Sequence, residues 1–403
     1  MRLALPRESL EIGDQRALRI LVAHAFYRLD GGENRYVRQQ VELLSRSHTV
    51  QLAEEHNEAL PGGLQAWARM TYSRQKKREF AELLDRFRPD VVHLHNSYPS
   101  TGPTVPLACE EAHIPLVHTV HNYRLRCPNA YMFTEGAICR RCEKGVYASA
   151  LMHKCFPEVR QSAAYASALW VHRFVMKLED KIALFVAPSR FMRDRLVHWD
   201  IPLERTTIVP NYVDPPSQKR AGTGDFGVYV GRISPEKGLD VLIRALVLAG
   251  DPPFKIVGDG PVYAEVRRLA ADSCLRRTEF LGHLPSETVM DVVNDCRYLA
   301  MPSMGEEVFP LAPLEAMAHG KPIVVSAIGG LPELVGDGGG LTFQPGNADK
   351  FARQIQKLNE DDDYCRAAGE AGLETWRERY SPEVHLALLQ QAYEMCIELH
   401  QGN

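Results

Sequence analysis

Two glutamates eight residues apart are the side chains of this sequence whose type and spacing most suggest chemistry. Glu307 lies in a loop, and Glu315 lies in the first turn of a short helix predicted over Leu314–His319. Pro313 suits the first helical position because its missing N–H would be unpaired there, and Gly320 suits the left-handed residue that ends the helix. One loop can therefore aim both carboxylates at a ligand held over the helix N-terminus. The alternative is that Glu315 only balances the helix dipole, an effect of about 0.3–1 kcal/mol at exposed sites.

Two cations form a second candidate pair. Arg232 and Lys237 lie in the loop GRISPEKG, which follows a predicted strand and is bracketed by Gly231 and Gly238. Loops beyond the carboxyl ends of parallel strands face the ligand-binding edge of a doubly wound sheet. An arginine fork and a compact lysine charge together suit one diphosphate. For an isolated pair of this kind, two solvated loop residues are the simpler alternative.

Glycine turns follow several predicted strands, at Gly31-Gly32, Gly258–Gly260 and Gly329-Gly330. Such turns let backbone amides approach a phosphate where a strand leads into a helix, which is how doubly wound sheets bind nucleotides. Each turn alone is weak support, because many α/β proteins carry one.

Strands that alternate with helices along the chain must position these residues. The predicted strands include 18–26, 91–96, 114–122, 206–211, 226–231, 254–258 and 323–325. This alternation implies parallel sheets. The stretch 213–226, rich in Pro, Gly and Ser, is the best candidate for a linker. Because 403 residues exceed the size at which one core keeps growing, we expect two Rossmann-like halves.

The composition limits the possible partners. The chain is 45 % apolar and 24 % charged with a net charge of −4, which fits an ordinary globular protein and argues against a nucleic-acid partner. No stretch approaches the ~18–20 apolar residues that a membrane span needs. Residues 1–17 look like a loose extension and lack the apolar segment of a secretory signal. We therefore expect a cytoplasmic protein.

In combination these motifs resemble the GT-B glycosyltransferases, and within them the large retaining group called family 4. The resemblance covers most of the chain and is strong in its second half. The matching motifs are GGENRYV (31–37), TVHNYR (119–124), IVPNYVD (208–214), GRISPEKGLD (231–240), KIVGDGP (255–261), FLGHL (280–284), the Glu307/Glu315 pair with LEAMAHGKPIV, and GGLPELV (329–335).

The resemblance implies an α/β protein of GT-B architecture, in which two Rossmann-like domains face a cleft. Residues 1–212 would form the acceptor-side domain, with a cysteine-rich insertion at 124–158. Residues 213–380 would form the nucleotide-sugar-binding domain. The helix within 381–403 would cross back onto the first domain.

The resemblance also implies a role for each matching residue. Arg232 and Lys237 would hold the donor diphosphate and stabilise the leaving nucleotide. Glu307 would contact donor-sugar hydroxyls, Glu315 the ribose hydroxyls, and His121 the sugar from the first domain. The other predicted donor-binding residues would supply close backbone approach or backbone contacts: Gly31, Gly32, Gly231, Gly258, Gly260, Gly282, His283, Leu284, Leu311, Ala312, Gly329 and Gly330.

The activity implied is a retaining, metal-independent transfer of a hexose from a nucleotide-diphosphate sugar to a lipid-linked or polysaccharide acceptor of the cell envelope. No cofactor is expected for catalysis. The alternatives are a noncatalytic nucleotide-sugar-binding protein of the same fold and a sugar-nucleotide epimerase. One position departs from the family, which often has E-G-F-G where this chain has Glu307 to Pro310. Pro310 has no N–H, so the amides of Leu311 and Ala312 would replace it.

Four of the nine cysteines have the spacing C-x11-C-x2-C-x12-C, at Cys127, Cys139, Cys142 and Cys155. Four thiolates can form a closed structural zinc site. The alternative is four reduced thiols in a loop-rich insertion.

Two stretches mix apolar with basic residues, at 67–80 and 162–178. Helices of this kind can rest on anionic membrane surfaces, which would place the protein peripherally on the inner face of the cell membrane. The alternative is that both helices pack on the protein's own core and leave a solvated basic face.

Overall fold

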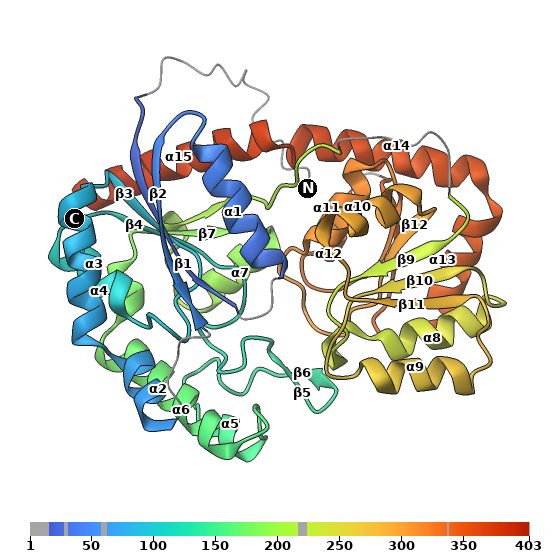
Figure 1. The fold of residues 1–403 in the computed structure, drawn as a ribbon, viewed down its shortest axis with the longest axis horizontal. Helices are drawn as coiled ribbons and strands as arrows, with labels where there is room; N and C mark the ends of the chain where they lie inside the picture. Colours follow the sequence, from blue (N-terminus) through green and yellow to red (C-terminus); the bar gives the residue numbers. More distant parts are fainter. Residues whose placement is uncertain (1–15, 28–30, 58–62, 217–223, 337, 403) are drawn as a thin grey trace.

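The computed structural model describes residues 16–27, 31–57, 63–216, 224–336 and 338–402. It forms two α/β domains, each built on a six-stranded parallel sheet (Figure 1). The N-terminal sheet has the order β2-β1-β3-β4-β7-β8. Its strands are β1 (Arg19–Phe26), β2 (Thr49–His56), β3 (Val91–Leu94), β4 (Leu116–Thr119), β7 (Leu184–Ala187) and β8 (Thr206–Ile208).

The C-terminal sheet has the order β11-β10-β9-β12-β13-β14, which is the strand order of a Rossmann fold. Its strands are β9 (Gly227–Val230), β10 (Phe254–Val257), β11 (Thr278–Gly282), β12 (Tyr298–Met301), β13 (Ile323–Ser326) and β14 (Gly340–Phe343). The order reverses between β9 and β12, and such a switch point is where doubly wound sheets bind ligands.

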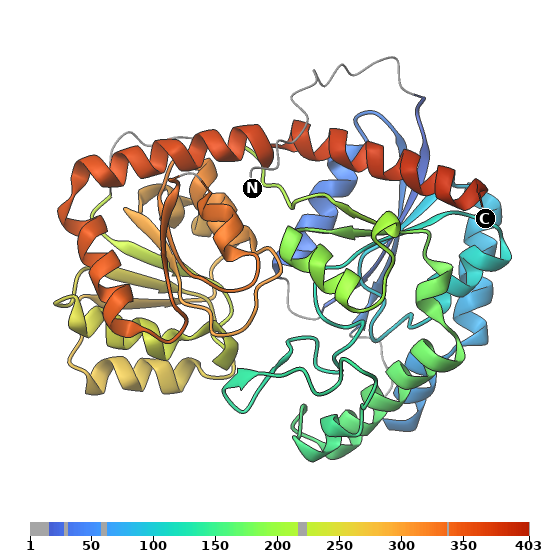
Figure 2. The same cartoon turned by 180° about the vertical axis from the view of Figure 1, so that it is seen from behind.

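Helices cover both faces of each sheet (Figures 1 and 2). The N-terminal domain contains α1 (Gly32–Leu44), α2 (Gly63–Thr71), α3 (Arg74–Phe87), α4 (Thr104–Glu111), α5 (Ser149–Met152), α6 (Val159–Trp170) and α7 (Arg190–His198), with a small hairpin of β5 (Phe133–Thr134) and β6 (Ala137–Ile138). The C-terminal domain contains α8 (Leu239–Leu248), α9 (Tyr263–Asp272), α10 (Ser286–Asp295), α11 (Leu311–Ala318), α12 (Leu331–Val335), α13 (Ala348–Glu360) and α14 (Asp362–Arg379).

The central strands are apolar because helices bury both of their faces. Every residue of β3, β7, β12 and β13 is buried. Continuous runs such as Leu-Phe-Val-Ala in β7 therefore replace the alternating pattern of a half-exposed strand. The predicted GT-B architecture with two Rossmann-like domains is confirmed.

The last helix, α15 (Pro382–Gln401), crosses back onto the N-terminal domain, as the resemblance implied (Figures 1 and 2). Its buried side chains Leu389, Tyr393 and Cys396 join the core formed by α1 and the N-terminal sheet. The Tyr393 hydroxyl lies 2.8 Å from Nδ1 of the buried His93 on β3. Since α14 packs on α11 in the C-terminal domain, the α14–α15 connection joins the two domains.

Several predicted boundaries were wrong. The helix expected over Leu314–His319 begins at Leu311, so Pro313 is its third residue and not its first. Pro313 is still tolerated there, because the first four helical N–H groups have no partner within the helix. Glu315 consequently lies in the second turn, where it cannot serve as a first-turn charge on the helix dipole. Gly320 has φ of 69° and ends the helix in the left-handed region, as predicted.

The two basic helices also differ from expectation. The stretch 67–80 is interrupted, because Ser73 caps α3 by accepting a hydrogen bond from the Lys76 amide. The stretch 162–178 lies in α6 and the π-helical turn Val171–Val175 that follows. The extension 1–15 and the linker segment 217–223 lie outside the described residues. Among the described helices, none has both the length and the apolar character needed to cross a membrane.

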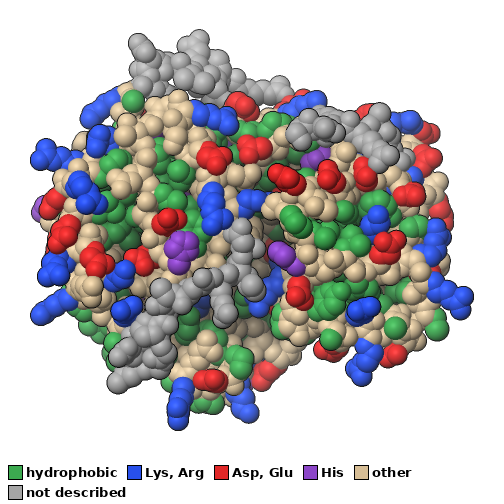
Figure 3. Space-filling model, viewed as in Figure 1, with side chains coloured by type: hydrophobic (Ala, Val, Ile, Leu, Met, Phe, Trp, Pro, Cys, Tyr) green, Lys and Arg blue, Asp and Glu red, His purple; other side chains and the backbone are tan. Residues whose placement is uncertain are grey.

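Figure 3 shows Lys and Arg interspersed with Asp and Glu over both domains on the face that it presents. An extended basic surface for a polyanion is not found on that face.

Candidate active site

Lys237 and Glu307 meet at the switch point of the C-terminal sheet. Lys237 ends a 3₁₀ turn after β9, and Glu307 lies in the loop after β12, the neighbouring strand. The Lys237 Nζ donates to Glu307 Oε1 at 2.7 Å, and the Ser303 hydroxyl donates to the same oxygen at 2.6 Å. Two sequence-predicted residues 70 positions apart are thus in direct contact. Sequence reasoning missed Ser303.

The glycine pair Gly329-Gly330 holds the Glu307 loop in place. The Gly330 amide donates to the Glu307 carbonyl at 2.8 Å. Gly329 has φ of 60°, and a Cβ built there would lie 2.3 Å from the Glu307 carbonyl oxygen. A close approach of two backbones therefore explains these glycines. In this arrangement they position Glu307 rather than open a surface to a phosphate.

Three other glycine turns lie side by side at the same edge of the sheet. The Gly231 carbonyl would be 1.9 Å from a Cβ at Gly258, and the Ile233 carbonyl would be 2.2 Å from one at Gly260. The Gly258 amide donates to the Gly282 carbonyl at 2.8 Å. These turns pack their backbones against one another, which brings the predicted residues after β9, β10 and β11 together. Beside them, His283 is exposed and Leu284 is partly buried in the C-terminal core.

Arg232 contacts the N-terminal domain. Its Nη1 donates to the Tyr131 hydroxyl, and its guanidinium lies 5.6 Å from the centre of the Tyr131 ring. Tyr131 belongs to the cysteine-rich insertion, close to the β5–β6 hairpin that reaches the C-terminal domain (Figures 1 and 2). Sequence reasoning missed Tyr131, because nothing in its local sequence indicates a partner 101 positions away.

Glu315 forms an ion pair across the domain interface. Arg35 on α1 donates from Nη2 to Glu315 Oε1, and the Glu315 side chain is only 6 % exposed. The starts of the two helices also meet, since a Cβ at Gly32 would lie 3.4 Å from Leu311 Cδ1. Gly31 precedes α1 as its N-cap and has extended backbone angles, while Ala312 follows Leu311 in the first turn of α11. Sequence reasoning missed Arg35.

His121 follows β4 and forms a pair with His95, which follows β3. His121 Nε2 lies 2.8 Å from His95 Nδ1, and the two rings stack with centroids 5.1 Å apart. The Tyr36 ring packs edge-on against His121 at 5.2 Å. Burial, followed by the charges of nearby histidines, lowers the pKa of His121 well below its ordinary value. A neutral His121 can offer one hydrogen bond to a ligand while His95 fixes its orientation.

Glu33, beside the glycine pair at the start of α1, is a further residue that sequence reasoning missed. Its carboxylate interacts with Asn122 and Tyr27. Desolvation outweighs both interactions and raises the pKa of Glu33 to about 7. Asn122, which follows His121 in the sequence, therefore contacts the Glu33 carboxyl group, whose pKa is near neutrality.

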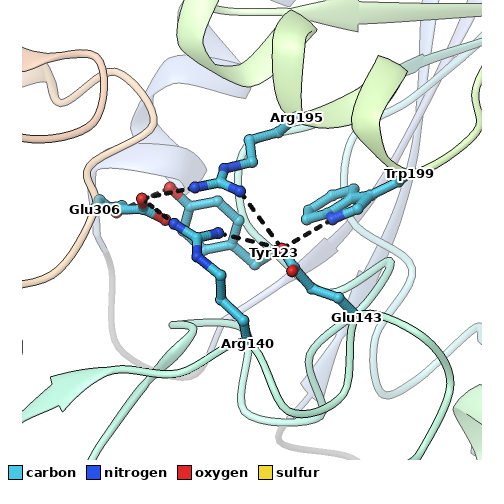
Figure 4. A network of polar contacts seen from close by, with 6 residues as sticks. All are labelled: Tyr123, Arg140, Glu143, Arg195, Trp199 and Glu306. Carbon is cyan, nitrogen blue, oxygen red and sulfur yellow. Dashed lines mark hydrogen bonds and ion pairs between the residues drawn. The ribbon is translucent and has the colours of Figure 1, made fainter.

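The loop before Glu307 is clamped to the N-terminal domain through Glu306 (Figure 4). The Glu306 Oε1 accepts from Arg140 Nη2 at 2.5 Å and from Arg195 Nη2 at 2.8 Å, while the Tyr123 hydroxyl donates to its carbonyl at 3.0 Å. Glu143 lies on the far side of the two arginines and accepts from the Trp199 indole at 3.1 Å. In the sequence, only the acidic pair Glu306-Glu307 drew attention to Glu306, and it did not indicate that Arg140, Arg195 and Tyr123 would be its partners.

The four clustered cysteines surround one small cavity. Cys127, Cys139, Cys142 and Cys155 line a space of about 10 Å³. Burial, and then the other three thiols, raise the pKa of Cys142 to about 12. Across the part of the chain that the structure describes, no three His, Cys, Asp or Glu side chains are already arranged to hold a metal ion.

The GT-B class is defined by two Rossmann-like domains. In this chain, charged and polar side chains that could bind a ligand follow strands of both sheets. The sequence profile described as "Glycosyl transferases group 1" matches residues 214–375, and that described as "Glycosyltransferase Family 4" matches residues 31–216. Together the two matches extend over both domains. The chain belongs to the GT-B glycosyltransferases of the family 4 type.

Curated relatives match part of the chain. The 2-deoxystreptamine glucosyltransferase of Streptomyces kanamyceticus is 31 % identical over 38 % of this chain and 45 % of its own length. The lipopolysaccharide 1,2-N-acetylglucosaminetransferase of Salmonella typhimurium is 27 % identical over 49 % of this chain and 58 % of its own. The chain thus spans about half the length of these relatives.

Solved structures share the fold over nearly the whole chain. A sucrose-phosphate synthase of Thermosynechococcus elongatus superimposes with a TM-score of 0.68 and 20 % identity, covering 95 % of this chain and 99 % of the other. The Anabaena protein HepE, solved with UDP and glucose, has a TM-score of 0.65 and 18 % identity, covering 93 % and 98 %. At these identities the likeness establishes the fold alone.

Proposed function

We propose that this protein is a retaining glycosyltransferase that moves a hexose from a nucleotide-diphosphate sugar to a lipid-linked or polysaccharide acceptor of the cell envelope. The observation that carries the proposal is the Lys237–Glu307 contact at the switch point, with Arg232 on the same sheet edge and His121 on the other domain. HepE binds UDP and glucose, and the Salmonella relative is a lipopolysaccharide transferase. The likeness to HepE supports a nucleotide-sugar donor, and the likeness to the Salmonella enzyme supports an envelope acceptor.

The donor would exchange contacts that the free protein makes with itself. A diphosphate entering the switch point would draw Lys237 from Glu307 and Arg232 from Tyr131. Glu307, held by Ser303, would then accept hydrogen bonds from hydroxyls of the sugar. Similarly, ribose hydroxyls would take the place of Arg35 at Glu315. Each partner in the free protein keeps a charge satisfied until the ligand arrives, which avoids an unpaired buried charge.

The reaction would break the bond between the sugar's anomeric carbon and the donor phosphate oxygen. The acceptor oxygen would bond to that carbon from the same face, and the acceptor proton would pass to the leaving phosphate. Charge would develop on the phosphate as the bond breaks, and the cations of Arg232 and Lys237 would lie beside it in the donor complex. Preorganised charges of this kind commonly contribute more to an enzyme's rate enhancement than any other single effect. This chemistry requires no metal, because the two side chains supply the positive charge.

An exposed apolar surface on the N-terminal domain is the proposed contact with an anionic membrane that carries the acceptor. Met152, Trp170, Phe174 and Val175 are between 44 % and 69 % exposed, and the rings of Trp170 and Phe174 lie 6.0 Å apart. Lys177 follows in sequence and adds positive charge. The protein would then act at the inner face of the cell membrane. Anionic phospholipid vesicles should co-sediment the protein and its Leu248→Glu control, but not Trp170→Glu; neutral vesicles should sediment none of them.

Transfer from donor to acceptor is the decisive measurement. The protein should be screened by thermal shift against nucleotide diphosphates and their sugars, beginning with UDP-glucose, since a bound ligand raises apparent stability. The stabilising donor is then incubated with envelope glycolipids, and the product is analysed for retained anomeric configuration. Binding without transfer or hydrolysis would favour the noncatalytic alternative, and an inverted product would refute the retaining mechanism.

A further inference from the structure

The insertion at residues 124–158, which we call the cysteine arm, has little regular structure to hold it. It contains the two-residue strands β5 and β6 and the single-turn helix α5. Its own apolar cluster is small and is built around Cys142, Tyr147 and Ala150 with two residues of α6. Cys127 and Met132 also join the main core of the N-terminal domain. Ordering a residue costs roughly 1–2 kcal/mol of backbone entropy, so these are few apolar contacts for a segment of this length.

Backbone strain in the cysteine arm lies next to its cysteines. Ala130, Met132 and Lys154 have φ of 66°, 47° and 44°, in the left-handed region that residues other than glycine rarely adopt. Each such residue costs of order 1 kcal/mol or more and persists where the surroundings enforce it. Lys154 immediately precedes Cys155, and the other two follow Cys127. The left-handed residues therefore indicate that interactions at Cys127 and Cys155 hold the backbone in this conformation.

The four cysteines come from three separate stretches of the arm and line one space. The cavity of about 10 Å³ that all four cysteines line is about the size of one water-sized sphere. Backbone groups of Asn129, Ala130 and Met132 hydrogen-bond to Cys127, and that of Ala150 to Cys142. Amides aimed at sulfur stabilise thiolate ligands in metal sites.

We propose that the four cysteines of the arm bind one structural zinc ion, which holds the arm in the conformation that contacts the C-terminal domain. Four thiolates saturate tetrahedral zinc, so the site would be closed and would take no part in the reaction. Binding converts Zn²⁺ and four thiols into a zinc tetrathiolate of charge −2 and releases four protons. Binding would require these side chains to rearrange until each sulfur lies roughly 2.3 Å from the ion. Arg141, which donates to Cys139 Sγ at 3.7 Å, would offset part of the charge.

The contacts that the arm makes with the other domain lie between its cysteines. Tyr131 bonds to Arg232, and Arg140 bonds to Glu306 beside Glu307. Phe133 also approaches the loop, with Cδ2 3.5 Å from a Cβ built at Gly305. Loss of the ion should release all three contacts together. An effect of the zinc ion on donor binding rests on the function proposed for Arg232. The proposed metal site does not depend on that function.

Metal analysis of the full-length protein tests the site directly. Protein purified without chelator or added zinc should contain about one zinc per chain, and its Cys139→Ser and Cys142→Ser variants should contain little. Cys274→Ser is the matched control, because Cys274 is exposed and outside the arm, and it should retain the zinc. Less than about a tenth of an equivalent of zinc, iron in its place, or disulfides among these cysteines would overturn the proposal.

A second measurement remains decisive if the serine variants fail to fold. Wild-type protein loaded with Co²⁺ should show the strong thiolate-to-cobalt charge-transfer absorption of a four-sulfur site, and its absence would count against zinc. Removal of the ion should speed hydrogen exchange over residues 130–143 while β9–β14 stay protected. Unchanged exchange would refute the proposed hold on the arm. Zinc-free protein with normal transfer and unchanged hydrogen exchange would overturn the proposed hold on the arm alone, whereas zinc-loaded protein without transfer would overturn only the proposed function.

Discussion

Acidification from pH 7 to pH 5 should unfold the N-terminal domain while the C-terminal domain stays folded. The reason is a set of buried histidines in the N-terminal domain and in α15: His24, His93, His172 and His385 are each at most 3 % exposed. Burial lowers the pKa of His93 to about 3 and that of the other three to about 4. The histidine pKa shifts resolved in the described structure all belong to this domain and α15.

The direction in which stability changes with pH follows from the number of protons that the folded and unfolded states bind. Between pH 6.5, the ordinary histidine pKa, and pH 4, the unfolded chain binds protons that the folded domain excludes, so stability falls as the pH falls. At pH 5 each histidine costs about 2 kcal/mol relative to pH 7, or about 8 kcal/mol for four. Glu33 has the opposite sign: its pKa of about 7 means that protonation returns about 2 kcal/mol on acidification. These groups alone give a loss of about 6 kcal/mol, and burial lowers the pKa of His118 to about 4 as well, which adds to the loss. A loss of this size is comparable with the whole stability of a typical domain.

Urea unfolding at pH 7, 6 and 5, combined with hydrogen exchange, measures this loss for each domain. His172→Gln should remove about 2 kcal/mol of this loss, because its ring is buried against Tyr98 and the Thr71 carbonyl. His283→Gln, at an exposed position of the C-terminal domain, should leave it unchanged. A loss of less than about 2 kcal/mol between pH 7 and pH 5, or earlier unfolding of the C-terminal domain, would refute the reasoning.

Four further outcomes test the site. Lys237→Ala and Glu307→Ala should each lower transfer about 10²-fold or more with the fold intact, and wild-type rates in both would exclude the assignment. Glu315→Gln should weaken donor binding about tenfold in calorimetry, whereas Arg35→Gln should not weaken it, because Arg35 competes with the ribose for Glu315. Gly329→Ala should destabilise the protein by about 2 kcal/mol or more in thermal unfolding; Gly250→Ala, also at positive φ but with no atom within 4 Å of the new Cβ, should cost less, and equal losses would contradict the close packing on Glu307. EDTA treatment that leaves the zinc of the cysteine arm in place should leave transfer intact, and complete loss of transfer with the fold and the zinc content preserved would disprove a metal-independent reaction.

The sequence was sufficient to predict the positions of site residues that depend only on one strand and the turn that follows it. Lys237 and Glu307 could be placed at the same sheet edge because carboxyl ends of parallel strands meet there, and the structure brings them to 2.7 Å. The partners from the other domain could not be found this way. Arg35 reaches Glu315 over 280 positions, and Arg140 reaches Glu306 over 166. Such contacts depend on how two domains dock, and neither periodicity nor turn chemistry encodes that.

Pro310 shows that a helix boundary can be predicted wrongly while the amides expected to replace its missing N–H, those of Leu311 and Ala312, stay the same. In the expected helix it preceded the first turn by several residues, and its missing N–H counted as a lost ligand contact. In the structure it is the N-cap of α11, with φ of −74° and ψ of 146°, so the first helical amides are those of Leu311 and Ala312. Pro313 removes the third. The helix therefore offers two consecutive amides beside Gly32, and an anion bound there would draw most of its charge compensation from Arg232 and Lys237.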